Sequence, residues 1–99
     1  MKFKVFKDAW LPMGAGLTLY PFVFIDSKNP VKTFKHECCH CYQIKSMGVI
    51  SFYLTWFWQF LQTRSITKGE LEQEAYAYDD HPLTDEEWEW YQNGYIILE

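Results

Sequence analysis

Hydrophobic and polar side chains alternate near the start of the chain in a pattern typical of β-strands. Over residues 2–7, lysine alternates with apolar side chains except where Val5 and Phe6 follow each other, which predicts a strand with one exposed face. Residues 18–25 are rich in β-forming side chains, and Pro21 among them indicates an edge position or a bend. We therefore expect early antiparallel strands, with an edge at residues 18–25 that an extended peptide can join.

The period then changes to that of helices, and capping residues mark the helix ends. Asn29 followed by proline is a typical helix start and Gly48 a typical stop, so we expect a helix over residues 30–47. A second helix is predicted over residues 51–63, where aromatic side chains recur at helical spacing. A loop over residues 64–69 ends it.

Two more helices complete the predicted fold. A helix over residues 70–79 carries several carboxylates, and the next one starts at Thr84, which forms a capping box with Glu87 and precedes a stop near Gly94. Two or three strands near the start of the chain and about four helices predict an α+β fold. A chain of 99 residues has room for a single small domain over residues 1–99.

The composition fits a globular protein with an unusual share of aromatic rings. Apolar residues make up 48% and charged residues 22%, which excludes a disordered chain, while aromatic residues reach 20%. Six of the nine residues over 52–60 are aromatic, too many for all of them to face one core. The others line a pocket, meet a second copy in a homodimer or contact a membrane interface, and these alternatives stay open.

Basic and acidic residues are divided along the chain, although the net charge is only −4. Residues 1–68 hold all nine Lys and Arg and three acids, whereas residues 69–99 hold ten acids and no base. Because the acidic third would repel phosphate groups, we expect no nucleic-acid partner.

The cysteines and the apolar stretches indicate a cytoplasmic protein. Cys38, Cys39 and Cys41 form an odd, clustered set that suits buried, reduced thiols better than disulfides, and a helix points them in different directions. The apolar stretch over residues 9–25 is interrupted by proline and glycine, and residues 49–61 are too few to span a bilayer. We expect no signal peptide and no transmembrane segment.

Residues 36–40 read His-Glu-Cys-Cys-His, an HExxH motif inside a predicted helix. Residues four apart share a helix face, so the imidazoles of His36 and His40 can reach one zinc ion. Glu37 then flanks the position of a water molecule and can act as general base. The motif therefore predicts zinc-dependent hydrolysis, with a third protein ligand still to be found.

The acidic helix over residues 70–79 is the place to look for that ligand. Glu72 shares a helix face with Ala75, which permits close helix approach, and with Asp79. Glu74 lies on a neighbouring face and remains a rival for the ligand role. The face that carries Glu72 looks suited to a metal, and the choice between Glu72 and Glu74 stays open at this point.

An HExxH helix followed about thirty residues later by a helix bearing Glu-x-x-Ala resembles the gluzincin group of zinc metallopeptidases. The run from His36 to Gln43, the aromatic helix and the Glu72 to Tyr76 segment are similar to small, phage-type peptidase-like proteins, over roughly residues 17–79. The resemblance implies a minimal zincin-like domain. It also implies that His36, His40 and Glu72 bind zinc, that Glu37 is the catalytic base and that Gln43 has a supporting role.

The sequence departs from this group at Tyr76, where an Asp or Asn is common, and Asp79 on the next turn is the candidate substitute. The expected function is a zinc metallopeptidase acting on a peptide or another amide. The alternative is a zinc-stabilised binding or structural module without hydrolysis. An open coordination position separates the two, because a structural zinc site is closed by a fourth protein ligand.

Overall fold

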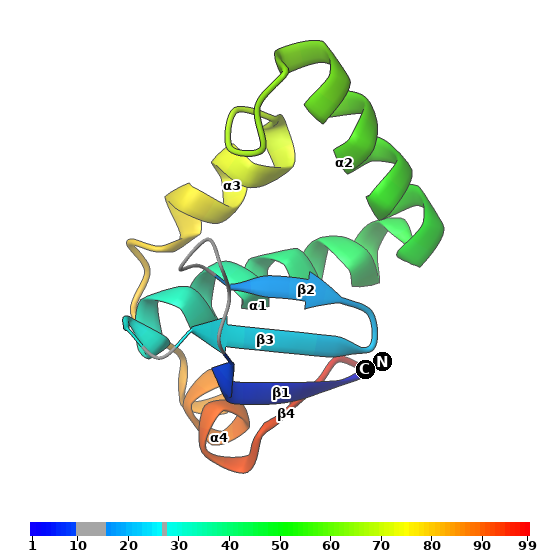
Figure 1. Ribbon diagram of the computed structural model, residues 1–99. Coiled ribbons are helices and arrows are strands. Elements are labelled where there is room, and N and C mark those ends of the chain that lie inside the picture. The colour runs from blue at the N-terminus through cyan, green and yellow to red at the C-terminus, as the bar shows by residue number, and fades with distance from the viewer. Residues whose placement is uncertain (10–15, 27) are drawn as a thin grey trace.

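The computed structural model describes residues 1–9, 16–26 and 28–99. It is an α+β fold with a four-stranded sheet and four helices, which confirms the predicted fold class (Figure 1). The strands are β1 (Lys2–Ala9), β2 (Leu17–Leu19), β3 (Phe22–Asp26) and β4 (Tyr95–Ile97), in the sheet order β2-β3-β1-β4. The helices are α1 (Pro30–Met47), α2 (Val49–Thr63), α3 (Glu70–Tyr78) and α4 (Asp85–Asn93).

The sheet differs from the prediction in three respects. Residues 18–25 are not one strand, because a turn at Tyr20 and Pro21 divides them into the antiparallel strands β2 and β3, and of these two only β2 lies at an edge of the sheet. Proline lacks the N–H that a continuous ladder needs. The sheet is mixed rather than antiparallel, since β1 and β3 run parallel. Finally, β4 at the end of the chain pairs with β1, and so the strands are not all early.

Helix α1 is the centre of the fold and covers one face of the sheet (Figure 1). Strand residues that point inward, such as Phe3 and Val23, meet Phe34 and Ile44 of α1 in a fully buried cluster. Burying these side chains is the main source of stability in such a fold. Helices α2 and α3 lie beyond the β2 edge, and α4 lies near β4.

The cysteines of α1 belong to this core. Cys38, Cys39 and Cys41 are free thiols and buried. Burial raises the pKa of all three, that of Cys39 to about 12, so they stay protonated at neutral pH. They pack as small apolar side chains.

The predicted helix ends are largely confirmed. Helix α1 follows Asn29, and Gly48 adopts a φ of 88°, which favours glycine and lets α2 begin at once, two residues earlier than expected. Thr84 and Glu87 form the predicted capping box, and Gly94 ends α4 in the left-handed conformation. Among the described residues, no helix is both long and apolar enough to cross a membrane.

Candidate metal site

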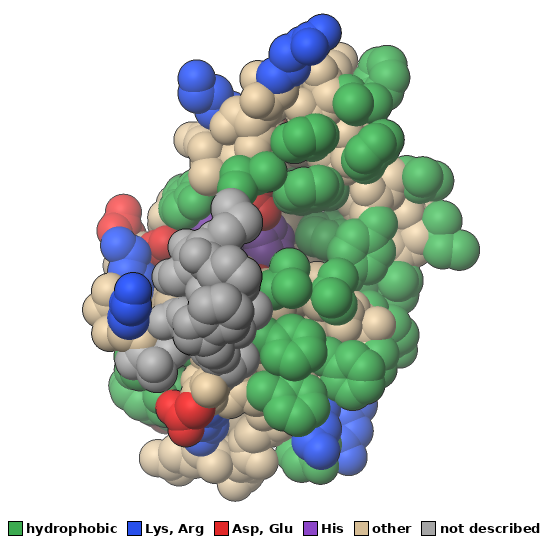
Figure 2. All heavy atoms as spheres, viewed as in Figure 1, with side chains coloured by type: hydrophobic (Ala, Val, Ile, Leu, Met, Phe, Trp, Pro, Cys, Tyr) green, Lys and Arg blue, Asp and Glu red, His purple; other side chains and the backbone are tan. Residues whose placement is uncertain are grey.

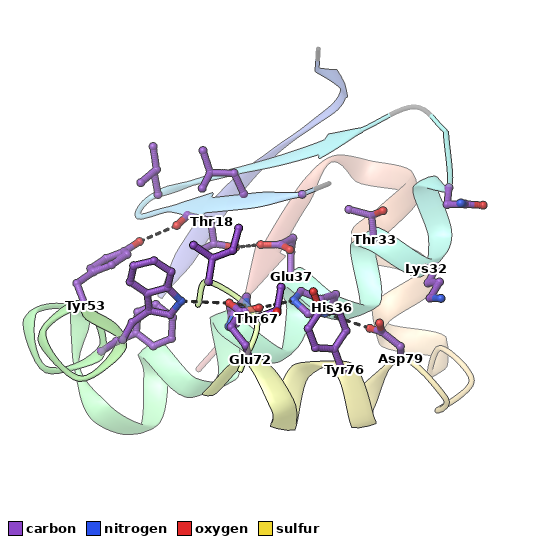
Figure 3. Close-up of a pocket in the computed structure, with 18 residues that line it drawn as sticks. Thr18, Lys32, Thr33, His36, Glu37, Tyr53, Thr67, Glu72, Tyr76 and Asp79 are labelled. Carbon is purple, nitrogen blue, oxygen red and sulfur yellow. Dashed lines mark hydrogen bonds and ion pairs between the residues drawn. The ribbon is translucent and has the colours of Figure 1, made fainter. Parts of the chain in front are cut away.

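Helices α1 and α3 bring together two imidazoles and a carboxylate (Figure 3). His36 Nε2 lies 3.1 Å from Glu72 Oε2, and His40 Nε2 lies 2.9 Å from Glu72 Oε1. One potential ligand atom from each residue lies within 4.8 Å of the other two. Two nitrogens and one carboxylate oxygen at this spacing are a donor set that a metal ion such as zinc accepts.

The charges in this cluster favour an ionised Glu72. Burial opposes its charge, but hydrogen bonds to His36 and His40 outweigh burial and lower the pKa of Glu72 to about 2. Burial also opposes protonation of His40, yet the hydrogen bond to Glu72 and the nearby Glu37 raise its pKa. Each histidine thus has a ring nitrogen within hydrogen-bonding distance of Glu72, and a metal ion bound between these atoms would release any proton there.

Gln43 fixes the orientation of His40. The Gln43 side-chain amide donates to the Leu71 carbonyl (3.0 Å) and to Glu74 Oε1 (3.0 Å). Its own oxygen therefore faces His40 Nδ1, 2.9 Å away, and accepts the proton there. This arrangement directs His40 Nε2 toward Glu72. It also places Glu74, the rival candidate, against Gln43 rather than in the His-His-Glu cluster.

Asp79 has the corresponding place beside His36. Asp79 Oδ1 is buried, and it lies 3.5 Å from His36 Nδ1. Burial raises the pKa of Asp79, against the opposing effect of His36. A carboxylate behind a ligand histidine holds the ring in the tautomer that a metal requires. Asp79 thus supplies the carboxylate beside His36 that was expected to substitute for the Asp or Asn common at the position of Tyr76. The Tyr76 ring itself packs on the His36 ring, with centroids 4.6 Å apart.

Glu37 lies beside the cluster and lines the same cavity. Its side chain is 3% exposed, and Oε1 accepts a 2.8 Å hydrogen bond from the Thr18 hydroxyl. Burial raises its pKa despite the opposing effects of His40 and His36. Gly16 passes so close that a Cβ there would lie 2.8 Å from Glu37 Oε2. The same Cβ would lie 2.5 Å from Thr33 Cγ2, so a side chain at residue 16 would force Thr33, Glu37 or the backbone of Gly16 to shift.

The cluster faces a cavity of about 630 Å³ between α1, α3, α2 and β2. One part of its wall is apolar and includes Phe52, Trp56 and Leu19, whereas another part is polar and includes Asn29 and Lys32. This volume is in the range of small-molecule and short-peptide sites.

Tyr53 of α2 occupies the outer edge of β2. Its hydroxyl accepts a 2.9 Å hydrogen bond from the Tyr20 N–H and donates one of 2.9 Å to the Thr18 carbonyl. These are the two bonds that one residue of an added parallel strand would make. The edge expected to receive a peptide is therefore already paired at this point.

Three contacts of the site have no counterpart in the sequence prediction. Trp56 Nε1 donates to Glu72 Oε1 (3.2 Å), and Thr18 and Tyr53 connect the β2 edge to the site. The helical spacing of the aromatic side chains predicts the helix but gives no sign that Trp56 contacts Glu72. Nothing in the sequence singles out Thr18.

Comparison of the chain with protein-family models, with curated proteins and with solved structures gives no match. The fold and the site thus define a small α+β protein with a possible His-His-Glu metal-binding group, formed by His36, His40 and Glu72.

Proposed function

We propose that this protein is a zinc-dependent hydrolase that cleaves a peptide or another amide bond. The observation that carries the proposal is the convergence of His36, His40 and Glu72 at the wall of a cavity that Glu37 also lines. Catalytic zinc sites use three protein ligands of these types, whereas structural sites use four. Within the described residues, no fourth His, Cys, Asp or Glu joins the group.

His36, His40 and Glu72 would hold the ion. When bound, zinc polarises a carbonyl group and lowers the pKa of water. Glu37 accepts the proton of the attacking water and later gives it to the leaving amine. Because Glu37 Oε1 is held by the Thr18 hydroxyl, Oε2 is the oxygen that takes this proton. Burial raises the pKa of Glu37, which suits a group that must both accept and return a proton.

The cavity supports an extended peptide as the substrate. Strand β2 forms one wall and is the edge of the sheet. A peptide that adds to this edge would displace the Tyr53 hydroxyl. The Thr18 carbonyl and the Tyr20 N–H would then bond to the backbone of the peptide. The apolar wall formed by Phe52 and Trp56 favours a large hydrophobic side chain.

The first experiment measures zinc per chain by elemental analysis in protein purified without added metal. We expect about one zinc in the wild type and a loss of zinc in His36→Ala and in Glu72→Ala. Glu74→Ala is the matched control, because Glu74 contacts Gln43 and stands outside the cluster. Wild-type protein that stays free of zinc after reconstitution would overturn the proposal.

The second experiment exposes zinc-loaded and chelator-treated protein to a peptide library. Cleavage that needs zinc supports the hydrolase. Stoichiometric zinc that raises the free energy of unfolding, with no cleavage of any peptide, would instead favour the zinc-stabilised module.

A further inference from the structure

Helix α2 exposes a hydrophobic stripe on the side that faces away from the cavity. Its spacing of four, three, one and three residues keeps the side chains on one helix face. Ile50 is 76% exposed and Trp58 60%, and α2 contains no charged residue. The stripe consists of Ile50, Leu54, Phe57, Trp58 and Leu61.

The outer face of the sheet, opposite α1, is also hydrophobic. The strand register aligns side chains across β2, β3 and β1 in two rows. The rings of Phe6 and Phe24 stack with centroids 5.2 Å apart, and Phe22 packs against both. One row is Leu17, Phe24 and Phe6, and the other is Leu19, Phe22 and Lys4.

On the side of the molecule shown in Figure 2, hydrophobic side chains gather over α2 and over the strands of the sheet. We call this surface the apolar face. A histidine is visible in a hollow that it borders (Figure 2). Leu17 and Leu19 belong both to the face and to the cavity wall, and they are 42% and 49% exposed. The cavity therefore opens onto the apolar face.

Four basic side chains lie near the apolar face, and Asp8 of β1 is an exposed acid there. Lys2 and Lys4 alternate with the inward-facing Phe3 and so project from the outer face of β1. Arg64 and Lys68 follow the end of α2 and are exposed. Basic side chains lie at both ends of the face (Figure 2), whereas ten of the thirteen acids belong to residues 69–99, beyond α2.

We propose that the apolar face docks onto the surface of an anionic lipid bilayer. Tryptophan and phenylalanine beside lysine and arginine are the side chains that enter the interface of such a membrane. A second copy on the same face fits less well, because a two-fold contact would bury two uncompensated sets of basic side chains together. The docking itself does not require zinc. If the proposed hydrolysis holds, docking further implies that the substrates are presented at a membrane, and this part of the inference rests on the proposed function.

The test is flotation of the protein with vesicles of phosphatidylcholine alone or mixed with phosphatidylglycerol. We expect the wild type to float with the anionic vesicles and Trp58→Gln to reduce its partition coefficient at least tenfold. Trp88→Gln is the matched control, since Trp88 is 42% exposed but belongs to α4. Replacing both Arg64 and Lys68 by Gln should weaken binding to anionic vesicles only, as should added salt.

Three results would overturn the docking proposal. The first is a folded wild type that remains with the soluble fraction, and the second is an equal loss of binding in both tryptophan variants. The third is a dimer that Trp58→Gln dissociates, with no vesicle binding, which would assign the face to a second copy. His36→Ala and Glu37→Gln should float like the wild type, so failure of the zinc chemistry and failure of docking are told apart.

Discussion

Two glutamates of this protein are almost fully buried, yet their surroundings differ. Glu87 is 1% exposed and accepts hydrogen bonds from the hydroxyls of Tyr42 and Tyr78 and from the Thr84 N–H. Burial opposes its charge, but these donors outweigh burial and lower its pKa. Glu37 is 3% exposed and has one hydroxyl donor, from Thr18, so burial raises its pKa.

Under the proposed hydrolysis, this difference distinguishes a structural acid, Glu87, from the proposed general base, Glu37. Glu87 joins α1, α3 and α4 through donors that satisfy its charge, and it has no proton to exchange at neutral pH. Glu37 lines the cavity next to the His-His-Glu cluster, and within the described part of the chain its carboxylate accepts a hydrogen bond from Thr18 only. A buried carboxylate that lacks donors costs stability, and such costs concentrate at functional sites.

The largest expected effect is that of Glu37→Gln on hydrolysis. Loss of the general base should lower kcat/KM about 10²- to 10⁴-fold, while the amide oxygen still accepts the Thr18 hydrogen bond. Zinc content and the free energy of unfolding should stay near the wild-type values, as elemental analysis and urea titration would show. Undiminished hydrolysis would place Glu37 with Glu87 among the structural acids.

Glu87→Gln should have the opposite profile. The neutral amide weakens the bonds from Tyr42 and Tyr78 and turns an N–H toward Thr84, so we expect a loss of about 2 kcal/mol in stability. Zinc content should not change. Glu86→Gln, one residue earlier and exposed, should cost less than about 0.5 kcal/mol. Equal costs in urea titration would mean that the tyrosine cluster adds nothing.

Asp79→Ala tests the residue behind the cluster. Removing the carboxylate beside His36 Nδ1 should weaken zinc binding about 10- to 100-fold, measured by competition with a chromogenic chelator. Asp80→Ala is the control, because Asp80 is exposed and follows directly in the chain. Zinc affinity that is the same in both variants would exclude Asp79 from orienting His36.

Much of this fold follows from local signals. Asn29, Gly48 and the Thr84 capping box act within a few residues, so they predict helix ends from the sequence alone. Strand β4 is not predicted from the sequence, because three residues are too few to show a periodic pattern. Its partner β1 lies at the other end of the sequence, so no local signal indicates the pairing. Pro21 predicts an edge position or a bend, and the structure has a turn at Pro21 beside the edge strand β2.

The candidate site divides in the same way. His36 and His40 share a face through helix geometry alone. The choice between Glu72 and Glu74 depends on how α3 rotates against α1, which tertiary packing decides. The contact of Thr18 with Glu37 spans nineteen positions and depends on where the β2 edge lies, so no spacing rule could reveal it.

The smallest expected effect is the pH dependence that Glu87 gives to the free energy of unfolding. Because its pKa is lowered on folding, the unfolded chain binds a proton more readily, and acid favours unfolding. The stabilisation from Glu87 is fully present above its ordinary pKa of 4.5 and is lost as pH falls through the folded value. The stability gap between wild type and Glu87→Gln should therefore shrink between pH 6 and pH 3 in urea titrations, by roughly 1 kcal/mol per pH unit at most. A gap that widens in acid would show that the folded protein prefers Glu87 protonated, and the contrast with Glu37 would then disappear.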